Sequence, residues 1–378
     1  MTEILFWVCL AIVIYTYIGY GIVLYLLVLI KRLATKAEPQ ADITDDCLPE
    51  VTLMVCAYNE EDVIAEKMEN TRQLDYPTDK LHLIWVTDGS NDSTNERLSA
   101  YPKVKVVFSP ERRGKAAALK HGIKHVNTEI VVMTDANTMI NPGAIREIAR
   151  LMQDPKVGCV SGEKKVMAKS DSDEAAQGEG LYWKYESTLK RLDSDLYSAM
   201  GAAGELCVIR RQLMTDIPDD SLLDDFIISM EIVKKGYKIA YTSKAYAMEY
   251  GSANLAEEGK RKRRIAAGGL QSSWRLRSLM NPLKYPLVAF QFVSHRVLRW
   301  TITPICLFAL IPLNTILVIS GESVIYTIIW VLQILFYTAA LAGIRIPSYF
   351  VFMNLNVFRG MAYLRNKHTG TWEKAKRA

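Results

Sequence analysis

The stretch LHLIWVTDGSND, Leu81–Asp92, decides the fold class of this chain. It is mostly apolar up to an aspartate, Asp88, which is followed by a Gly-Ser-Asn turn. A second stretch, EIVVMTDAN, reaches Asp135 in the same way. Short apolar runs rich in valine and isoleucine, closed by turn residues, are typical of buried parallel strands. We therefore expect both aspartates at the carboxyl ends of strands, where open α/β sheets bind their ligands.

The residues around these two runs alternate between strand and helix patterns. The expected order is strand Val51–Ala57, a helix from Asn59 through about Leu74, strand Leu81–Thr87, helix Ser93–Ala100, strand Val104–Phe108, helix Lys115–Val126, strand Ile130–Thr134 and helix Pro142–Met152. This rhythm predicts an α/β fold with a doubly wound, mostly parallel sheet.

Apolar segments at both ends of the chain predict membrane helices. The charge-free runs Ile4–Ile30, Trp300–Gly321 and Ser323–Ile344 are each long enough to cross a bilayer. A signal peptide would have a shorter apolar core and a basic segment before it, so we expect the first run to be an uncleaved span. Asn281–Arg299 mixes apolar and basic residues, which predicts an amphipathic helix in the interface. The uncharged stretch Ile346–Phe358 is too short for a span and is expected to be interfacial or re-entrant.

Basic residues next to these runs predict the orientation. They follow the first and third runs and precede the second, whereas Gly321–Ser323 carries none. The positive-inside rule then places 31–299 and the tail in the cytoplasm and the N-terminus outside, in a multi-pass protein of the inner membrane. The expected units are a span in 1–36, a cytosolic domain in 37–280, an interfacial helix in 281–299, two spans in 300–344, and an interfacial segment with a basic tail in 345–378.

Composition limits the partners. The net charge of +5 is largely explained by the juxtamembrane basic clusters, which attract anionic lipid. No interleaved basic and aromatic pattern suggests nucleic acid. The six cysteines are scattered without a CxxC pair, so reduced thiols are expected and a zinc site is not.

Polar side chains at the strand ends suggest donor and metal chemistry. Asn59, Glu60 and Asp88 can hydrogen-bond the base and ribose of a nucleotide, although DGSND also suits a simple turn. Asp135-Ala136-Asn137 offers two oxygen ligands on one side of an extended backbone, as Mg²⁺ uses together with substrate phosphates. Alternatively, Asn137 or Asn141 caps the helix that follows.

Three charged clusters suggest roles in group transfer, each with a simpler alternative. Arg112–Lys115 places cations and a glycine at a helix start, which suits a diphosphate or a solvated turn. Asp224 and Asp225 precede an apolar-periodic helix and supply a general base or an N-cap. The basic run 260–264 neutralises a leaving diphosphate or binds anionic lipid.

The order of these motifs resembles the membrane-bound family 2 glycosyltransferases. VCAYNE, VTDGSNDST, RRGKAAAL, TDAN, GAAGE, LLDDF and an RxxRI element follow one another as in that family, and Trp372–Arg377 is similar to the end of such chains. The resemblance is closest to the exopolysaccharide, cellulose-synthase-like and N-acetylglucosaminyltransferase-like branch. It implies a GT-A fold, a nucleotide-sugar donor that is usually UDP-linked, Mg²⁺ or Mn²⁺, and inversion at the anomeric carbon.

The resemblance also implies roles for single residues. The donor would meet Ala57, Asn59, Glu60, Asp88, Lys115, Asp135, Arg261 and Arg264; the metal would meet Asp135 and Asn137; the acceptor would pass Gly201, Ala202, Ala203 and Gly204; and Asp225, with Asp224 beside it, would be the catalytic base. Processive members usually carry QxxRW, where this chain reads Arg261, Arg264 and Ile265. This departure, and the small number of spans, argue against processive polymerisation.

Three functional hypotheses follow. The first is inverting transfer of a sugar to a glycan or lipid-linked acceptor at the cytoplasmic membrane face, in polysaccharide synthesis. The second changes the acceptor to polyprenyl phosphate. The third is a catalytically inactive scaffold subunit in a membrane complex. An oligomer or an export partner stays open.

Overall fold

The computed structural model describes residues 1–35, 44–167, 174–251, 255–321 and 323–365. The C-terminal motif Trp372–Arg377 therefore lies outside the described residues, as does Glu322 in the link between the last two apolar runs.

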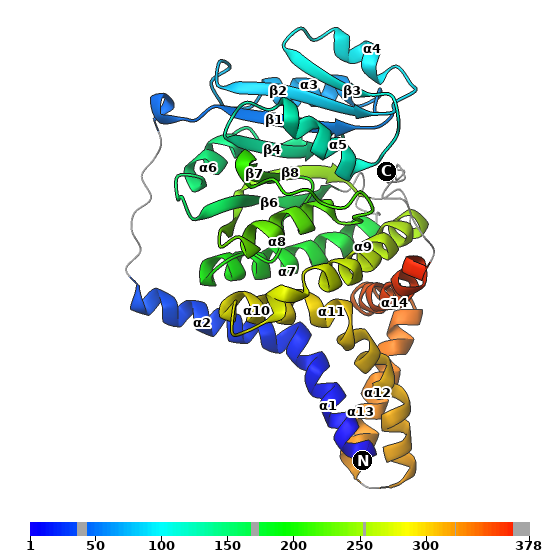
Figure 1. Cartoon of the computed structure of the whole chain (residues 1–378). Coiled ribbons are helices and arrows are strands. Elements are labelled where there is room, and N and C mark those ends of the chain that lie inside the picture. Colours follow the sequence, from blue (N-terminus) through cyan, green and yellow to red (C-terminus); the bar gives the residue numbers. More distant parts are fainter. Residues whose placement is uncertain (36–43, 168–173, 252–254, 322, 366–378) are drawn as a thin grey trace.

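The described residues form one eight-stranded sheet in the order β3-β2-β1-β4-β7-β6-β8-β5 (Figure 1). Its strands are β1 Val51–Ala57, β2 Leu81–Asp88, β3 Val104–Ser109, β4 Ile130–Asp135, β5 Met139–Ile140, β6 Val157–Met167, β7 Cys207–Arg210 and β8 Lys238–Tyr250. β1 to β4 are parallel to their neighbours in that group, and β6 is parallel to β8. β7 is antiparallel to both β4 and β6, and β5 is antiparallel to β8. The predicted doubly wound, mostly parallel sheet is confirmed.

Helices cover both faces of this sheet. Those that pack on it are α3 Ile64–Arg72, α4 Thr94–Ser99, α5 Lys115–Gly122, α6 Ala144–Leu151, α7 Glu174–Leu196 and α8 Asp224–Lys234, and α9 Leu255–Arg275 follows β8 and packs on other helices. In β1, Met54 and Cys56 join the core under α5 and α8, whereas Leu53 and Val55 join the core under α3, α4 and α6. A strand buried on both faces needs apolar side chains in both directions, which explains the unbroken apolar runs in the sequence.

The helix after β1 begins later than its sequence indicates. It starts at Ile64 rather than near Asn59, because residues of the preceding loop bind the loop that follows β2. The helix expected over 115–126 ends at Gly122 and continues as a 3₁₀ turn, Ile123–His125. Such differences of a few residues are usual at helix ends.

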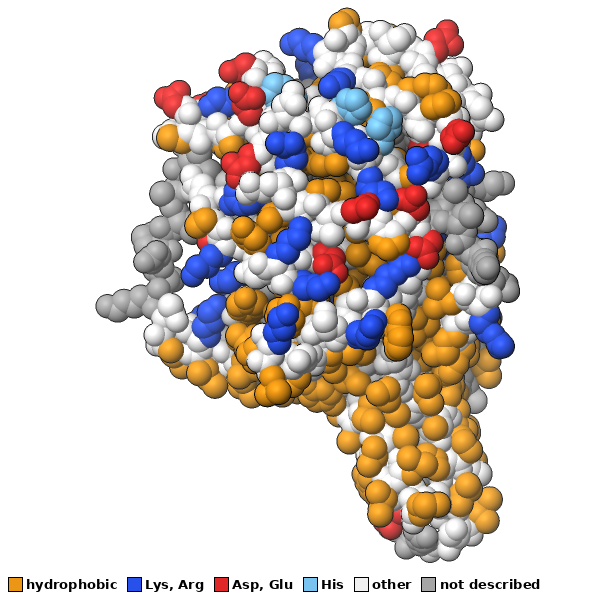
Figure 2. Space-filling model, viewed as in Figure 1, with side chains coloured by type: hydrophobic (Ala, Val, Ile, Leu, Met, Phe, Trp, Pro, Cys, Tyr) orange, Lys and Arg blue, Asp and Glu red, His pale blue; other side chains and the backbone are white. Residues whose placement is uncertain are grey.

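Among the described residues, three helices are long and apolar enough to cross a membrane. They are Thr2–Ala34, which comprises α1 Thr2–Ile14 and α2 Tyr20–Ala34, then α12 Ile302–Ile319 and α13 Val324–Leu341. In Figure 1, α1 runs with α12 and α13 in a projection away from the sheet, and Figure 2 shows that this projection is coated with hydrophobic side chains.

The first apolar run is bent, which the prediction of one span over 4–30 did not include. A π-helical turn, Tyr15–Gly19, separates α1 from α2, and α2 runs along the base of the sheet domain (Figure 1). Tyr20, Leu24 and Val28 form a stripe at four-residue spacing that packs on Leu189 of α7. This stripe carries no charge, so the apolar run alone could not distinguish it from a lipid-facing surface.

Four further helical segments among the described residues lie between the sheet domain and the projection. They are α10 Pro286–Phe292, a π-helical turn Val293–Val297 and α11 Leu298–Trp300, followed after α13 by α14 Arg345–Arg365. The segment predicted as one helix over 281–299 is therefore helical only from Pro286 onward. α14 packs along α9, and the interfacial or re-entrant character of this segment stays a prediction.

The contact between α14 and α9 depends on a glycine. A Cβ added at Gly360 would lie 2.7 Å from the backbone nitrogen of Ala267 and 2.9 Å from the Cβ of Ala266. At Gly259, on α9, a Cβ would also face α14, but the nearest atom, Phe352 Cε2, would be 3.8 Å away. Both glycines are helical, so they form a matched pair for mutation.

We expect Gly360→Ala to lower the free energy of unfolding by about 1–3 kcal/mol, because the added methyl overpacks a backbone contact. Gly259→Ala should be neutral or stabilising by up to about 1 kcal/mol, since alanine favours helix and finds room. Thermal unfolding of the detergent-purified chain measures both. Equal stability of the two variants would show that the close approach of α14 and α9 is wrong.

Candidate active site

The carboxyl ends of β2, β1 and β4 lie side by side at one edge of the sheet. Asp88 ends β2 and is 1% exposed. Its two carboxylate oxygens accept backbone hydrogen bonds from Arg113 at 2.9 Å and Gly114 at 2.7 Å. Gly114 has a φ of 96°, which favours glycine, and it immediately precedes α5. Asp88 therefore positions the loop that precedes Lys115. A contact between Asp88 and a nucleotide stays a prediction.

The loops after β1 and β2 are tied together by Asn59. Its side-chain amide donates to the Asn91 Oδ1 at 2.7 Å and its oxygen accepts from the Asn91 backbone at 2.9 Å. The backbone nitrogen of Glu60 donates to Thr94 Oγ1 at 2.9 Å, and Ala57 is buried at the end of β1. The residues of DGSND thus form a turn bound to the loop after β1, and the contact of Ala57, Asn59 and Glu60 with a nucleotide stays a prediction.

Lys115 is the cation at the centre of the site. Its Nζ lies 2.5 Å from the Oδ1 of Asp135 at the end of β4. A Cβ added at Gly204 would lie 3.4 Å from that Nζ and 3.1 Å from the Oδ2 of Asp225. The fold therefore brings together the start of α5, the end of β4, the GAAGE loop and the start of α8, which are far apart in sequence.

The charged side chains at this point shift one another's pKa values. Burial lowers the pKa of Lys115, but the attraction of Asp135, Asp224 and Asp225 outweighs burial and raises it well above its usual value. Burial and the neighbouring Asp224 raise the pKa of Asp225 to about 7, with Glu205 adding to the shift. A carboxyl group with a pKa near neutrality is suited to accept a proton at physiological pH.

Asp224 and Asp225 occupy different environments. Helix α8 begins at Asp224, and the residue before it, Leu223, gives no side-chain cap, so the N-cap alternative is not supported. Asp224 is 5% exposed, and its Oδ2 has no hydrogen-bond partner among the described residues. Asp225 is less buried and faces Gly204. Both carboxylates still lie in the first turn, where the helix dipole favours them.

Most of the predicted acceptor loop is buried behind the site and does not face it. Gly201, Ala202 and Ala203 are buried, and the backbone nitrogens of the two alanines donate to Ser229 Oγ and Ser161 Oγ. Gly201 has a φ of 95°, and a Cβ there would lie 2.2 Å from the ring of Phe226. Of these four residues, Gly204 alone is partly exposed, and it faces Asp225.

The Asp135-Ala136-Asn137 turn rests on a residue that sequence reasoning missed. Lys67 is fully buried in α3 and its Nζ donates to the Thr138 backbone oxygen at 2.5 Å and lies 3.4 Å from Thr134 Oγ1. Burial lowers the pKa of Lys67 to about 7, against the attraction of Asp135. Ile64, Lys67 and Thr71 share one buried helix face, a spacing visible in the sequence.

The side chain of Asn137 is partly exposed and has no hydrogen-bond partner within the described part of the chain. Asn141 does not cap α6, whose N-cap is Gly143. Instead it binds β8, donating to the Lys244 oxygen at 3.0 Å and accepting from the Tyr246 nitrogen at 2.7 Å. The capping alternative for Asn141 is therefore wrong, and Asn137 remains a candidate ligand.

The basic run on α9 is largely engaged with acidic partners. Arg261 pairs with Glu249 at 3.1 Å and Glu258 at 3.2 Å and is 14% exposed. Glu249 also binds Lys164, a buried lysine that lies 2.5 Å from Glu205 of the GAAGE loop. This network ties α9 to the sheet and the acceptor loop through Arg261, whose contact with a diphosphate stays a prediction.

Arg264 differs from Arg261. It is partly exposed and has no ion pair among the described residues. Helix α9 itself lies against the segment before α8, since a Cβ at Gly268 would lie 2.6 Å from Leu223 and the Gln271 side chain accepts from the Leu222 backbone at 3.1 Å. A diphosphate contact from Arg264 stays a prediction.

The residues present fit a divalent cation shared with a diphosphate. Within the described chain, no three histidine, cysteine or acidic side chains converge to hold a metal alone. Lys115 nevertheless faces Asp135, Asp224 and Asp225, which leaves the cluster negative when the carboxylates are ionised. Mg²⁺ typically takes only one or two carboxylates and completes its shell with phosphates and water.

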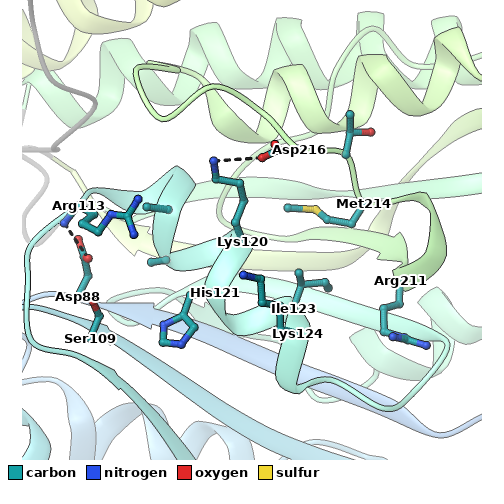
Figure 3. A pocket seen from close by; sticks show the side chains of 13 residues that line it. Asp88, Ser109, Arg113, Lys120, His121, Ile123, Lys124, Arg211, Met214 and Asp216 are labelled. Atoms are coloured by element: carbon teal, nitrogen blue, oxygen red, sulfur yellow. Dashed lines mark hydrogen bonds and ion pairs between the residues drawn. The ribbon is translucent and has the colours of Figure 1, made fainter.

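A cavity of about 710 Å³ beside α5 is separate from this centre (Figure 3). Asp88 and Arg113 lie at one end of it, and Lys120 reaches Asp216 across it at 3.2 Å. Lys115, Asp135 and Asp225 are not among the residues that line it. The predicted base and metal ligands therefore lie outside this cavity, whereas Asp88, a predicted donor residue, lines it.

Comparison with known proteins agrees with this geometry. Residues 49–268 match the model of the family described as "Glycosyltransferase like family 2". The chain belongs to this family.

Its relatives and a solved structure support the same assignment. The chain is 28% identical over 284 residues to a poly-β-1,6-N-acetyl-D-glucosamine synthase of Staphylococcus aureus, covering 71% of this chain and 67% of that protein. It is 26% identical over 270 residues to the synthase of the same name from Staphylococcus epidermidis, covering 68% and 63%. A mannosyltransferase from Pyrobaculum calidifontis, solved with GDP-Man and Mn²⁺, matches in fold with a TM-score of 0.73 and 22% identity over 97% of this chain and 99% of that one. The predicted GT-A fold and glycosyltransferase class are confirmed.

The raised pKa of Asp225 predicts a pH-dependent cost to stability. Between about pH 4 and pH 7 the carboxyl is ionised in the unfolded chain but protonated in the folded one, so rising pH destabilises the fold. We expect Asp225→Asn to be more thermostable than the wild type above pH 7 and equal to it near pH 4. Thermal unfolding across that range measures the difference.

Asp62→Asn is the control, because Asp62 is exposed. Its difference from the wild type should not change with pH. A pH-independent difference for Asp225→Asn as well would contradict the buried carboxylate pair.

Proposed function

We propose that this chain is an inverting glycosyltransferase of the inner membrane that acts in polysaccharide synthesis. It transfers a sugar from a nucleotide-sugar donor, most simply a UDP-sugar, to a glycan or lipid-linked acceptor at the cytoplasmic face. The main support is the position of the Asp225 carboxylate, which faces Gly204 beside Lys115, the ion-pair partner of Asp135. The relatives' name, poly-β-1,6-N-acetyl-D-glucosamine synthase, makes UDP-N-acetylglucosamine the first donor to test.

Donor binding is assigned to the strand-end groups. Lys115 binds the diphosphate, and Asp135 with Asn137 holds Mg²⁺ or Mn²⁺. When bound, the cation would act as a Lewis acid for the departing nucleotide. Asp88 and Asn59 keep the loops around the nucleotide in place through the hydrogen bonds described above.

Asp225 is assigned as the base. It accepts the proton of an acceptor hydroxyl placed beside Gly204, and that oxygen attacks the anomeric carbon on the face opposite the leaving nucleotide. Lys115 and the basic run 260–264 of α9, in which Arg264 has no ion pair among the described residues, stabilise the charge that develops on the diphosphate. Because this is one displacement, the anomeric configuration inverts.

The two aspartates should differ in effect. Asp225→Asn should lower kcat by several orders of magnitude and leave donor affinity intact, because the base acts on the acceptor. Asp224→Asn should cost less. Transfer from radiolabelled UDP-N-acetylglucosamine, with donor binding by calorimetry, measures both. A larger loss in Asp224→Asn at unchanged donor affinity would reverse the assignment.

The metal assignment predicts a different pattern. Asp135→Asn should abolish transfer and also weaken Mn²⁺-dependent donor binding by at least about tenfold, since it removes a charged ligand. Lys67→Met tests the support beneath the same loop and should reduce Mn²⁺ affinity less. Calorimetric titration of UDP with and without Mn²⁺ gives both values. Full activity in Asp135→Asn would contradict the metal site, and no turnover of any donor by the wild type would favour a scaffold.

A further inference from the structure

A second cavity, of about 330 Å³, lies where the sheet domain meets the apolar projection. We name it the interface cavity. Its walls include Tyr182 of α7, Ile265 of α9, Arg299 and Trp300 of α11, and Phe350 and Val357 of α14. α12 begins two residues after Trp300, and α13 ends shortly before α14 begins. The cavity is therefore at the level where the membrane-length helices leave the domain.

The lining combines an apolar chamber with a surplus of positive charge. Its aliphatic and aromatic side chains are accompanied by four basic ones: Lys262, Arg296, Arg299 and Arg345. Glu186 is the partner of Arg296 at 2.7 Å and of Arg299 at 3.2 Å. Lys262 lies 3.2 Å from Glu258.

The remaining groups do not cancel this surplus. His295 also lines the cavity, but it lies between Asp193 at 2.5 Å and Glu186 at 3.3 Å, so any charge on it is already opposed. Arg345, at the start of α14, is exposed and has no ion pair among the described residues. The lining therefore suits an anionic group at the mouth of an apolar space.

The cavity shares a wall with the proposed base. The ring of Trp300 packs edge-on against Phe226 with centroids 5.1 Å apart, and Phe226 directly follows Asp225. Arg296 donates to the backbone oxygen of Met200, at the start of the acceptor loop, at 2.8 Å. Two residues of the lining, Trp300 and Arg296, thus contact the helix that carries Asp225 and the acceptor loop.

We infer that the interface cavity holds the apolar chain of the acceptor, which is a lipid carrying a phosphate or diphosphate that links it to the sugar. This inference rests on the proposed function and specifies its acceptor. A chain lying between α11 and α14 would enter from the bilayer, its phosphate would meet Arg345 and the neighbouring basic groups, and its sugar would extend toward Gly204 and Asp225. The volume is at the lower end of the range for ligand pockets, which favours one chain over a two-chain phospholipid.

The test uses the full-length chain in detergent and hexadecyl phosphate as the probe. We expect this probe to raise the thermal unfolding temperature and, when it carries a diazirine on its chain, to cross-link to peptides of α11 and α14. Hexadecanol lacks the charge and inorganic phosphate lacks the chain, so neither should protect. Dioleoyl phosphatidate, which has two chains, should protect less than hexadecyl phosphate at equal concentration.

Two variants with matched controls locate the site. Met353 lines the cavity, so Met353→Trp should fill it and abolish cross-linking, whereas Leu355→Trp, on an exposed part of the same helix, should not. Arg345→Gln should weaken binding about tenfold through the lost charged contact, whereas Arg365→Gln should leave it unchanged. Donor binding in each variant shows that the fold is retained.

The outcomes separate this inference from the proposed function. No protection by hexadecyl phosphate, or equal protection by dioleoyl phosphatidate that neither Met353→Trp nor Arg345→Gln changes, would overturn the cavity assignment. Donor hydrolysis by the wild type would still support glycosyl transfer in that case. Conversely, specific cross-linking without any donor turnover would keep the lipid site and remove the enzyme assignment.

Discussion

The site depends on one lysine that balances three carboxylates. Lys115 comes from α5, Asp135 from β4, and Asp224 and Asp225 from α8, so a single ammonium group holds three separate elements at one point. Charges a few ångströms apart and partly removed from water interact by several kcal/mol, at about 4 kcal/mol for a pair at 4 Å. Without that cation the carboxylates would repel both one another and a diphosphate. The ammonium also limits how far the pKa of Asp225 rises.

Much of the sheet could be predicted because its strands are buried on both faces. Such strands must be apolar throughout and must end in turn residues, which is how β1, β2 and β4 were recognised and why Asp88 and Asp135 fall at one edge. What the sequence could not reveal is how each carboxylate is used. Asp88 matched a nucleotide-binding pattern, yet its oxygens bind the backbone before α5. That pairing depends on a loop path that no local pattern encodes.

Buried ionic groups were the other part that sequence reasoning missed. Lys164, Glu205 and Glu249 are separated along the chain, and no spacing rule relates β6, the GAAGE loop and β8. Only the packed structure shows that Arg261 belongs to this network, which no sequence pattern indicated, and its predicted contact with a leaving diphosphate stays a prediction. Breaking one partner of a buried ion pair typically destabilises by about 3–5 kcal/mol, since it leaves a charge uncompensated.

The bend at Tyr15–Gly19 has a mechanical consequence. Because α1 lies with α12 and α13 while α2 is bound to α7, the domain is docked on its anchor rather than tethered by a loose connection. Lys31 reinforces this by donating to the backbone oxygens of Asp195 and Leu196 at 2.7 and 2.8 Å. Under the proposed function, a catalytic centre held this way would keep a fixed height and tilt above the lipid, so that a substrate confined to the bilayer would need to search only two dimensions to reach it.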